Sequence, residues 1–127
     1  MANLLSYHDM IERYENGENA FDISVEKWKR IKENVDMAHT PQQFHSILEY
    51  AAFKVPLCVE YDNNCSVCPL TRVCSSGVDG SFQKFMRTLQ AFCIAGDVLP
   101  NSALTNLAEK VIVELEECKE QFKKTVS

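Results

Sequence analysis

The chain has 127 residues, of which 46% are hydrophobic and 24% charged, and its formal net charge is −5. This length and balance predict one soluble globular domain spanning residues 1–127. The acidic excess disfavours nucleic acid as a partner, because broad contact with phosphates relies on clustered Lys and Arg. It suits docking to a partner protein instead.

The N-terminal sequence MANLLSYHDMIERYE lacks the basic start, long apolar run and small-residue cleavage site of a signal peptide. No apolar run approaches the length that spans a bilayer. We therefore expect a cytoplasmic protein with no membrane association. In such a reducing compartment, clustered cysteines are expected to bind metal rather than to form disulfides.

The first predicted helix covers residues 3–16 and is followed by a turn at residues 16–19, which contains Gly17. Its predicted apolar face consists of Leu4, Tyr7, Ile11 and Tyr14.

The second predicted helix begins at Ser24, whose hydroxyl is a good N-cap. Its apolar face carries Val25, Trp28, Ile31 and Val35. The same segment holds the basic residues Lys27, Lys29, Arg30 and Lys32. Because successive residues turn by about 100°, these cations spread around the helix. We expect solvated flanks around a core-facing Trp28, and the alternative is a basic, aromatic surface for nucleic acid.

The third predicted helix has the clearest start. Thr40 can be the N-cap, Pro41 fits the first helical position and Gln43 completes a capping box. Val55 should end the helix because the proline after it disfavours helical backbone at that residue. The apolar face of this helix is Phe44, Ile47, Leu48 and Ala51.

The fourth predicted helix begins at a capping Ser81 and ends at Gly96. Its apolar face is Phe82, Phe85, Met86, Leu89, Phe92 and Cys93. The last helix is predicted over residues 102–124. Its apolar residues alternate steps of four and three, as in a heptad seam: Leu104, Ala108, Val111, Leu115, Cys118 and Phe122. This seam suits packing onto the other helices, and a homodimer through the C-terminal helix is the alternative.

Together these patterns predict an all-α fold, a small helical bundle of about five helices with a cysteine-ligated metal loop at one end. The predicted metal-binding loop is residues 57–75. A stretch of seventeen residues inside this loop holds four cysteines at the spacing C-x6-C-x2-C-x5-C: Cys58, Cys65, Cys68 and Cys74.

The spacing favours a [4Fe–4S] cluster over zinc. Structural zinc sites commonly use two short C-x2–4-C hooks, and here only Cys65 and Cys68 form one. A cuboidal cluster offers four separated iron corners, which a chain with unequal spacers can reach. Zn²⁺ remains the alternative to the cluster, and a pair of disulfides is the third possibility.

The spacing, together with the sequence CSVCPLTRVC, resembles the cluster loop of the endonuclease III and MutY family of DNA glycosylases. The resemblance implies that Cys58, Cys65, Cys68 and Cys74 ligate a [4Fe–4S] cluster, and it covers only about the seventeen residues of the loop. Part of the motif also resembles WhiB-like regulators. A looser resemblance links the early Trp-containing helix and the cysteine loop to small uncharacterised proteins of phage and prokaryotic genomes.

Full cysteine ligation leaves no open iron for a substrate, and no catalytic motif accompanies the cysteines. We therefore expect an electron-transfer, structural or sensing accessory to a partner protein rather than an enzyme. The alternative is a nucleic-acid-binding or regulatory protein whose cluster or zinc orders the recognition surface. Cys93 and Cys118 are expected to fill the core as small apolar residues, and His45 is expected at the surface.

Overall fold

The computed structural model describes residues 4–38, 40–52, 80–95 and 101–126. These residues form five helices and no strand, which confirms the all-α prediction. The helices are α1 (Tyr7–Glu15), α2 (Ala20–Met37), α3 (Pro41–Ala52), α6 (Ser81–Ala95) and α7 (Ser102–Val126).

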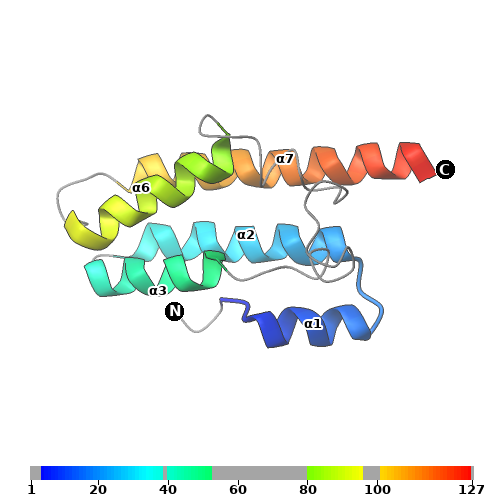
Figure 1. Ribbon diagram of the computed structural model, residues 1–127, viewed down its shortest axis with the longest axis horizontal. Helices are drawn as coiled ribbons and strands as arrows, with labels where there is room; N and C mark the ends of the chain where they lie inside the picture. Colours follow the sequence, from blue (N-terminus) through cyan, green and yellow to red (C-terminus); the bar gives the residue numbers. More distant parts are fainter. Residues whose placement is uncertain (1–3, 39, 53–79, 96–100, 127) are drawn as a thin grey trace.

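Helices α2, α3, α6 and α7 form an up-and-down bundle, in which each helix runs opposite to the one before it (Figure 1). The pairs α2–α7, α3–α6, α6–α7 and α2–α3 are in contact, and α1 lies along α2. The C-terminal end of α3 and the N-terminal end of α6 lie on the same side of the bundle (Figure 1). The helix ends that precede and follow the cysteine segment therefore lie on the same side of the bundle.

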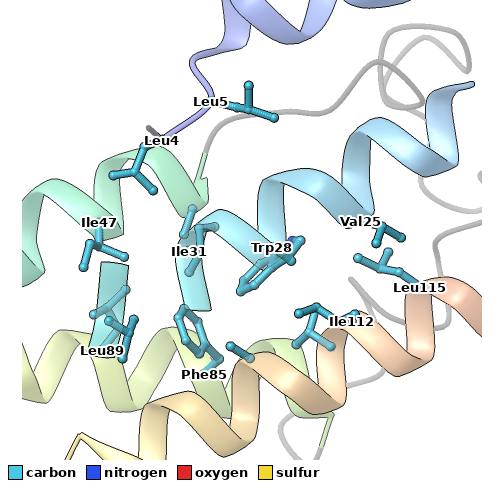
Figure 2. Close-up of a cluster of buried hydrophobic side chains, with 14 of the residues drawn as sticks. Leu4, Leu5, Val25, Trp28, Ile31, Ile47, Phe85, Leu89, Ile112 and Leu115 are labelled. Atoms are coloured by element: carbon cyan, nitrogen blue, oxygen red, sulfur yellow. The ribbon is translucent and has the colours of Figure 1, made fainter. Parts of the chain in front are cut away.

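The core lies between these four helices, and Trp28 stands near its centre (Figure 2). The rings of Phe44 on α3 and Phe92 on α6 meet edge to face with their centroids 4.9 Å apart. Such aromatic pairs bury large apolar areas and add a specific contact beyond the area they bury. The fully buried large side chains are Phe44, Phe85, Phe92, Met10, Ile23, Ile31, Ile47, Leu89, Leu104 and Val35.

The first helix begins later than residue 3. Ser6 is the N-cap of α1: its Oγ accepts a hydrogen bond from the Asp9 amide, and the Asp9 carboxylate accepts one from the Ser6 amide. This capping box fixes the start of the helix. Leu4 and Leu5 precede it as a non-helical segment buried in the core. Met10 is the buried residue of α1, so the predicted apolar face was wrong in detail.

The second helix begins at Ala20 rather than at Ser24. Asn19 is its N-cap, and its side-chain oxygen accepts hydrogen bonds from the amides of Phe21 and Asp22. Ser24 lies inside the helix, where its hydroxyl donates to the carbonyl of Ala20. The preceding turn was predicted correctly, and Gly17 adopts a φ of 95° there, a conformation that favours glycine.

The start of α3 agrees with the prediction. The Gln43 amide donates to Thr40 Oγ1 and the Thr40 amide donates to Gln43 Oε1, at 3.2 and 3.1 Å. The predicted end at Val55 lies outside the described residues, as does Gly96 after α6. Ser81 is the first helical residue of α6 rather than the residue before it, so it is not the N-cap, and its hydroxyl donates to Glu114 on α7.

The heptad-like seam of α7 is buried within the chain from Leu104 to Cys118, and the side chain of Phe122 lies outside the described part. Helix α7 lies along α2 and also contacts α6 (Figure 1). Packing onto the other helices therefore accounts for the seam, and a homodimer through α7 would have to use other residues. The buried seam residues are Leu104, Ala108, Val111, Leu115 and Cys118.

Candidate metal centre

The four predicted ligands, Cys58, Cys65, Cys68 and Cys74, lie outside the described residues, in the stretch that joins α3 to α6. The loop 57–75 lies there too, and so does the loop that precedes α6 up to residue 79. The structure does describe the two helical ends that flank the cysteines. Both ends are held by consecutive residues of α2.

The chain leaves α3 beside a buried lysine. Lys27 is only 3% exposed, and its Nζ donates to the carbonyl of Ala51 at 3.1 Å. Ala51 lies in the last turn of α3, where backbone carbonyls have no partner within their own helix. A cation at this end is also favoured by the helix dipole. Lys27 therefore stabilises the end of α3 that leads toward Cys58.

The chain enters α6 against the next residue of α2. The Trp28 ring meets Phe85 edge to face at a centroid distance of 5.0 Å, and Phe82 at 5.7 Å. Figure 2 shows Trp28 in the layer between α2 and the helices α6 and α7, with Phe85 nearby. Phe82 and Phe85 occupy the first two turns of α6. Trp28 therefore holds the helical end that follows Cys74.

A polar contact holds the same end of α6 to α7. The Ser81 hydroxyl donates to Glu114 Oε1 at 2.9 Å, and both residues are half-buried. A hydrogen bond to an ionised carboxylate is stronger than one between neutral groups. The start of α6 is thus fixed on two sides, by Trp28 from α2 and by Glu114 from α7.

The two remaining cysteines behave as core residues, as predicted. Cys118 is buried, while Cys93 is half-buried and packs against the core. Burial raises the pKa of the Cys93 thiol above its ordinary value, which favours the protonated form. Metal ligation and redox reactions use the thiolate. Cys93 therefore lacks the surroundings of a reactive cysteine.

No other group of residues forms a metal site in the part of the chain that the structure describes. There, no three His, Cys, Asp or Glu side chains come together as ligands. His8 and His45 are exposed, and each lies near a glutamate one turn along its own helix, at 3.8 and 3.5 Å. His45 is at the surface, as predicted, and His39 lies outside the described residues.

The basic segment of α2 does not form an exposed basic and aromatic surface. Trp28 is 4% exposed, so its ring is not available to stack on a base. Arg30 pairs with Glu26 at 2.9 Å, and Lys32 pairs with Glu109 at 2.7 Å. The prediction that the cations are all solvated was wrong for Lys27, which points inward to α3.

Lys27 is the residue of this region that sequence reasoning missed. A signal was present, because Lys27 lies between Ile23 and Ile31 at steps of four residues, and both isoleucines are buried. Such i, i+4 spacing places all three residues on one side of the helix. A lysine on an apolar face indicates a buried acceptor, which here is a carbonyl at the C-terminal end of α3.

None of the described helices combines the length and the apolar character needed to cross a bilayer. Comparisons with protein-family models, curated proteins and solved structures found no significant match.

Proposed function

We propose that the chain binds one [4Fe–4S] cluster through Cys58, Cys65, Cys68 and Cys74. The observation that carries the proposal is the placement of four cysteines at C-x6-C-x2-C-x5-C within seventeen residues. Thiolates are the ligands that iron–sulfur clusters use. Zn²⁺ is the alternative occupant, since it also binds four thiolates.

The helical scaffold supports this proposal. The cysteine segment is joined to α3 and α6, whose ends meet consecutive residues of one turn of α2. Holding both ends of a segment lowers the conformational entropy that the segment loses when its ligands gather. A metal that binds such a segment adds its binding free energy to the stability of the fold.

We further propose that the loaded protein acts as an electron-transfer, structural or sensing accessory to a partner protein in the cytoplasm. Ligation by four cysteines leaves no iron open for a substrate, which favours these roles over catalysis. The net charge of −5 suits a partner with a basic surface. The nucleic-acid alternative is weakened because Trp28 and Lys27 face the interior.

The first experiment is anaerobic purification followed by a visible spectrum and analysis of iron, sulfide and zinc on one sample. A cluster gives a brown protein with about four irons per chain. About one zinc per chain in a colourless protein would replace the cluster with a structural zinc site. Neither metal at stoichiometric amounts would refute the proposal.

Two variants test the ligands. Cys65→Ser and Cys68→Ser should each lose bound metal and lower the melting temperature, because metal binding and folding are coupled. Cys93→Ser is the matched control, since Cys93 is a half-buried cysteine on α6 with no predicted role in binding. If the Cys65 and Cys68 variants keep wild-type metal content and melting temperature, the ligand assignment is wrong.

A redox titration of the iron-loaded protein separates the accessory roles. A reversible potential that a cellular partner can reach supports electron transfer. A cluster that keeps one redox state throughout the titration excludes electron transfer and leaves the structural role.

A further inference from the structure

Residues 4–15, which we call the strap, are attached to the bundle at a few apolar points. Leu4 and Leu5 lie in its non-helical part and Met10 lies in α1, and these side chains are 6%, 3% and 0% exposed. In Figure 2, Leu4 points from the strap toward Ile47 on α3. The other side chains of the strap are exposed or half-buried, and Tyr14 is the half-buried one that packs against the core. Three buried side chains therefore anchor the strap.

Helix α1 depends on this docking for its helical structure. It has nine residues and lies along α2, and isolated helices shorter than about 12–15 residues are marginal in water. The capping box at Ser6 fixes where the helix begins, but it does not attach the helix to the bundle. When Met10 leaves its site, the helix therefore unfolds as well, which makes undocking and unfolding one cooperative event.

The bundle is held together by contacts that do not involve the strap. The edge-to-face ring pairs Phe44–Phe92 and Trp28–Phe85 join α6 to α3 and to α2. Asn19, which follows the strap, caps α2 through the amides at its start. Segments with few buried apolar contacts open at a lower free energy than the core of the same protein. The strap is such a segment, and the bundle is not.

The turn at residues 16–19 is suited to be the hinge. Its residues are all exposed, and Gly17 has a φ of 95°. No described atom beyond the chain neighbours of Gly17 lies within 4 Å of the position that a Cβ would take. Across the turn, the Glu18 amide donates to the Arg13 carbonyl at 3.1 Å, and the two side chains pair at 3.9 Å. Because surface ion pairs contribute little, the turn can change its backbone angles at low cost.

We propose that the strap opens as one unit about this turn while the four-helix bundle stays folded. Opening withdraws Leu4, Leu5 and Met10 together and exposes the apolar site that they fill. In the closed state the strap itself occupies that site, so the strap controls access to it. Opening requires no metal, and the proposal therefore stands or falls independently of the proposed function.

Native-state hydrogen exchange on the full chain, without denaturant, tests the proposal. The protected amides of α1 should exchange together and faster than those in the middle of α2 and α7, because a local opening reaches them without unfolding of the bundle. Equal protection of α1 and α2 would overturn the proposal, since the strap would then open only when the whole chain unfolds.

Met10→Ala and Leu5→Ala test whether the strap is one unit. Each change removes a buried anchor and should speed the exchange of the α1 amides by at least about 10-fold, the effect of a typical large-to-small change in a core. Leu5 lies outside α1, so its effect on the helix arises only if both anchors open together. Exchange of α1 at the wild-type rate in Leu5→Ala would show that the anchors open separately, and the strap would not exist as a unit.

Leu104→Ala is the control, since Leu104 is fully buried on α7. It weakens the bundle equally in the closed and open states, so it should speed exchange in the middle of α2 and α7 and leave α1 at the wild-type rate. Faster exchange of α1 in this variant would overturn the proposal, because α1 would then exchange through unfolding of the bundle. If Leu104→Ala fails to fold, Ile112→Val on the same helix is the milder control.

Discussion

The two long helices α2 and α7 lie against each other, yet they bury different kinds of side chain. Helix α7 buries apolar residues and Cys118, arranged as a seam. Helix α2 also buries Ser24, Lys27 and Asn34, which are the buried polar or charged residues among those that the structure describes. These three side chains donate to backbone carbonyls, those of Ala20, Ala51 and Arg30 respectively.

Apolar burial on α7 and buried hydrogen-bond donors on α2 contribute to the fold in different ways. Apolar burial is strong but non-directional, so the seam of α7 stabilises the bundle without fixing the ends of its neighbours. A buried donor must meet a particular acceptor, and its cost when unpaired makes the contact specific. Helix α2 therefore carries the contact that positions the end of α3, and α7 supplies much of the packing.

Leu104→Ala should have the largest effect on stability. Leu104 is fully buried in the seam of α7, and a leucine-to-alanine change at such a site costs about 2–5 kcal/mol through lost burial and the cavity it leaves. Urea unfolding measures the change. Val113→Ala on the same helix is the control: Val113 is 46% exposed, so its effect should stay within roughly 0.5 kcal/mol. A loss below about 1 kcal/mol at Leu104 would contradict the packing role of α7.

Asn101 should have the next largest effect, since it brings a directional contact from the start of α7 to the end of α2. Its Nδ2 donates to the carbonyls of Val35 and Ala38, both at 2.9 Å. Asn101→Ala removes both hydrogen bonds and should cost about 1–2 kcal/mol in urea unfolding.

Asn101→Asp should also destabilise the fold, because a carboxylate cannot donate to these carbonyls at neutral pH and its charge lies at the negative, C-terminal end of α2. An aspartate variant as stable as the wild type would show that these two hydrogen bonds do not fix the end of α2.

The helical scaffold was predictable wherever its pattern was local and repetitive. The capping box at Thr40 and Gln43 and the buried seam of α7 needed only spacing and capping chemistry. The start of α2 was missed because Asn19 and Ser24 are both competent caps, and sequence alone does not say which one the tertiary structure uses. Lys27 was missed because its acceptor, Ala51, is distant in the sequence. The ligand set of the candidate site came from cysteine spacing alone.

The ion pair between Lys32 and Glu109 should contribute less than the buried contacts. It joins α2 to α7 at the surface, with an Nζ to Oε2 distance of 2.7 Å and side chains 36% and 51% exposed. A double-mutant cycle with Lys32→Ala and Glu109→Ala should give a coupling of about 0.2–1 kcal/mol. High salt should reduce that coupling, because screening acts on exposed charges. A coupling that salt leaves unchanged would mean that the pair is shielded from solvent.

Helix α1 sharpens the contrast, because it buries only Met10 and its start depends on an exposed capping box. The Ser6 side chain is the main cause that lowers the pKa of Asp9, and the Ser6 backbone amide is the second. A lowered pKa in the folded state means that the charged carboxylate stabilises the fold. This contribution is present above the ordinary pKa of an aspartate, about 3.9, and is lost as the pH falls through the lower folded value.

Ser6→Ala should therefore raise the pKa of Asp9 toward its ordinary value, with the smallest effect on stability of all these changes because the Asp9 carboxylate is exposed. Titration of the Asp9 carboxyl carbon by NMR measures the shift. Ser102→Ala, an exposed serine at the start of α7, is the control and should leave the pKa of Asp9 unchanged. If Ser6→Ala also leaves it unchanged, the capping box does not hold the first turn of α1. That helix would then depend on Met10 and its contact with α2 alone.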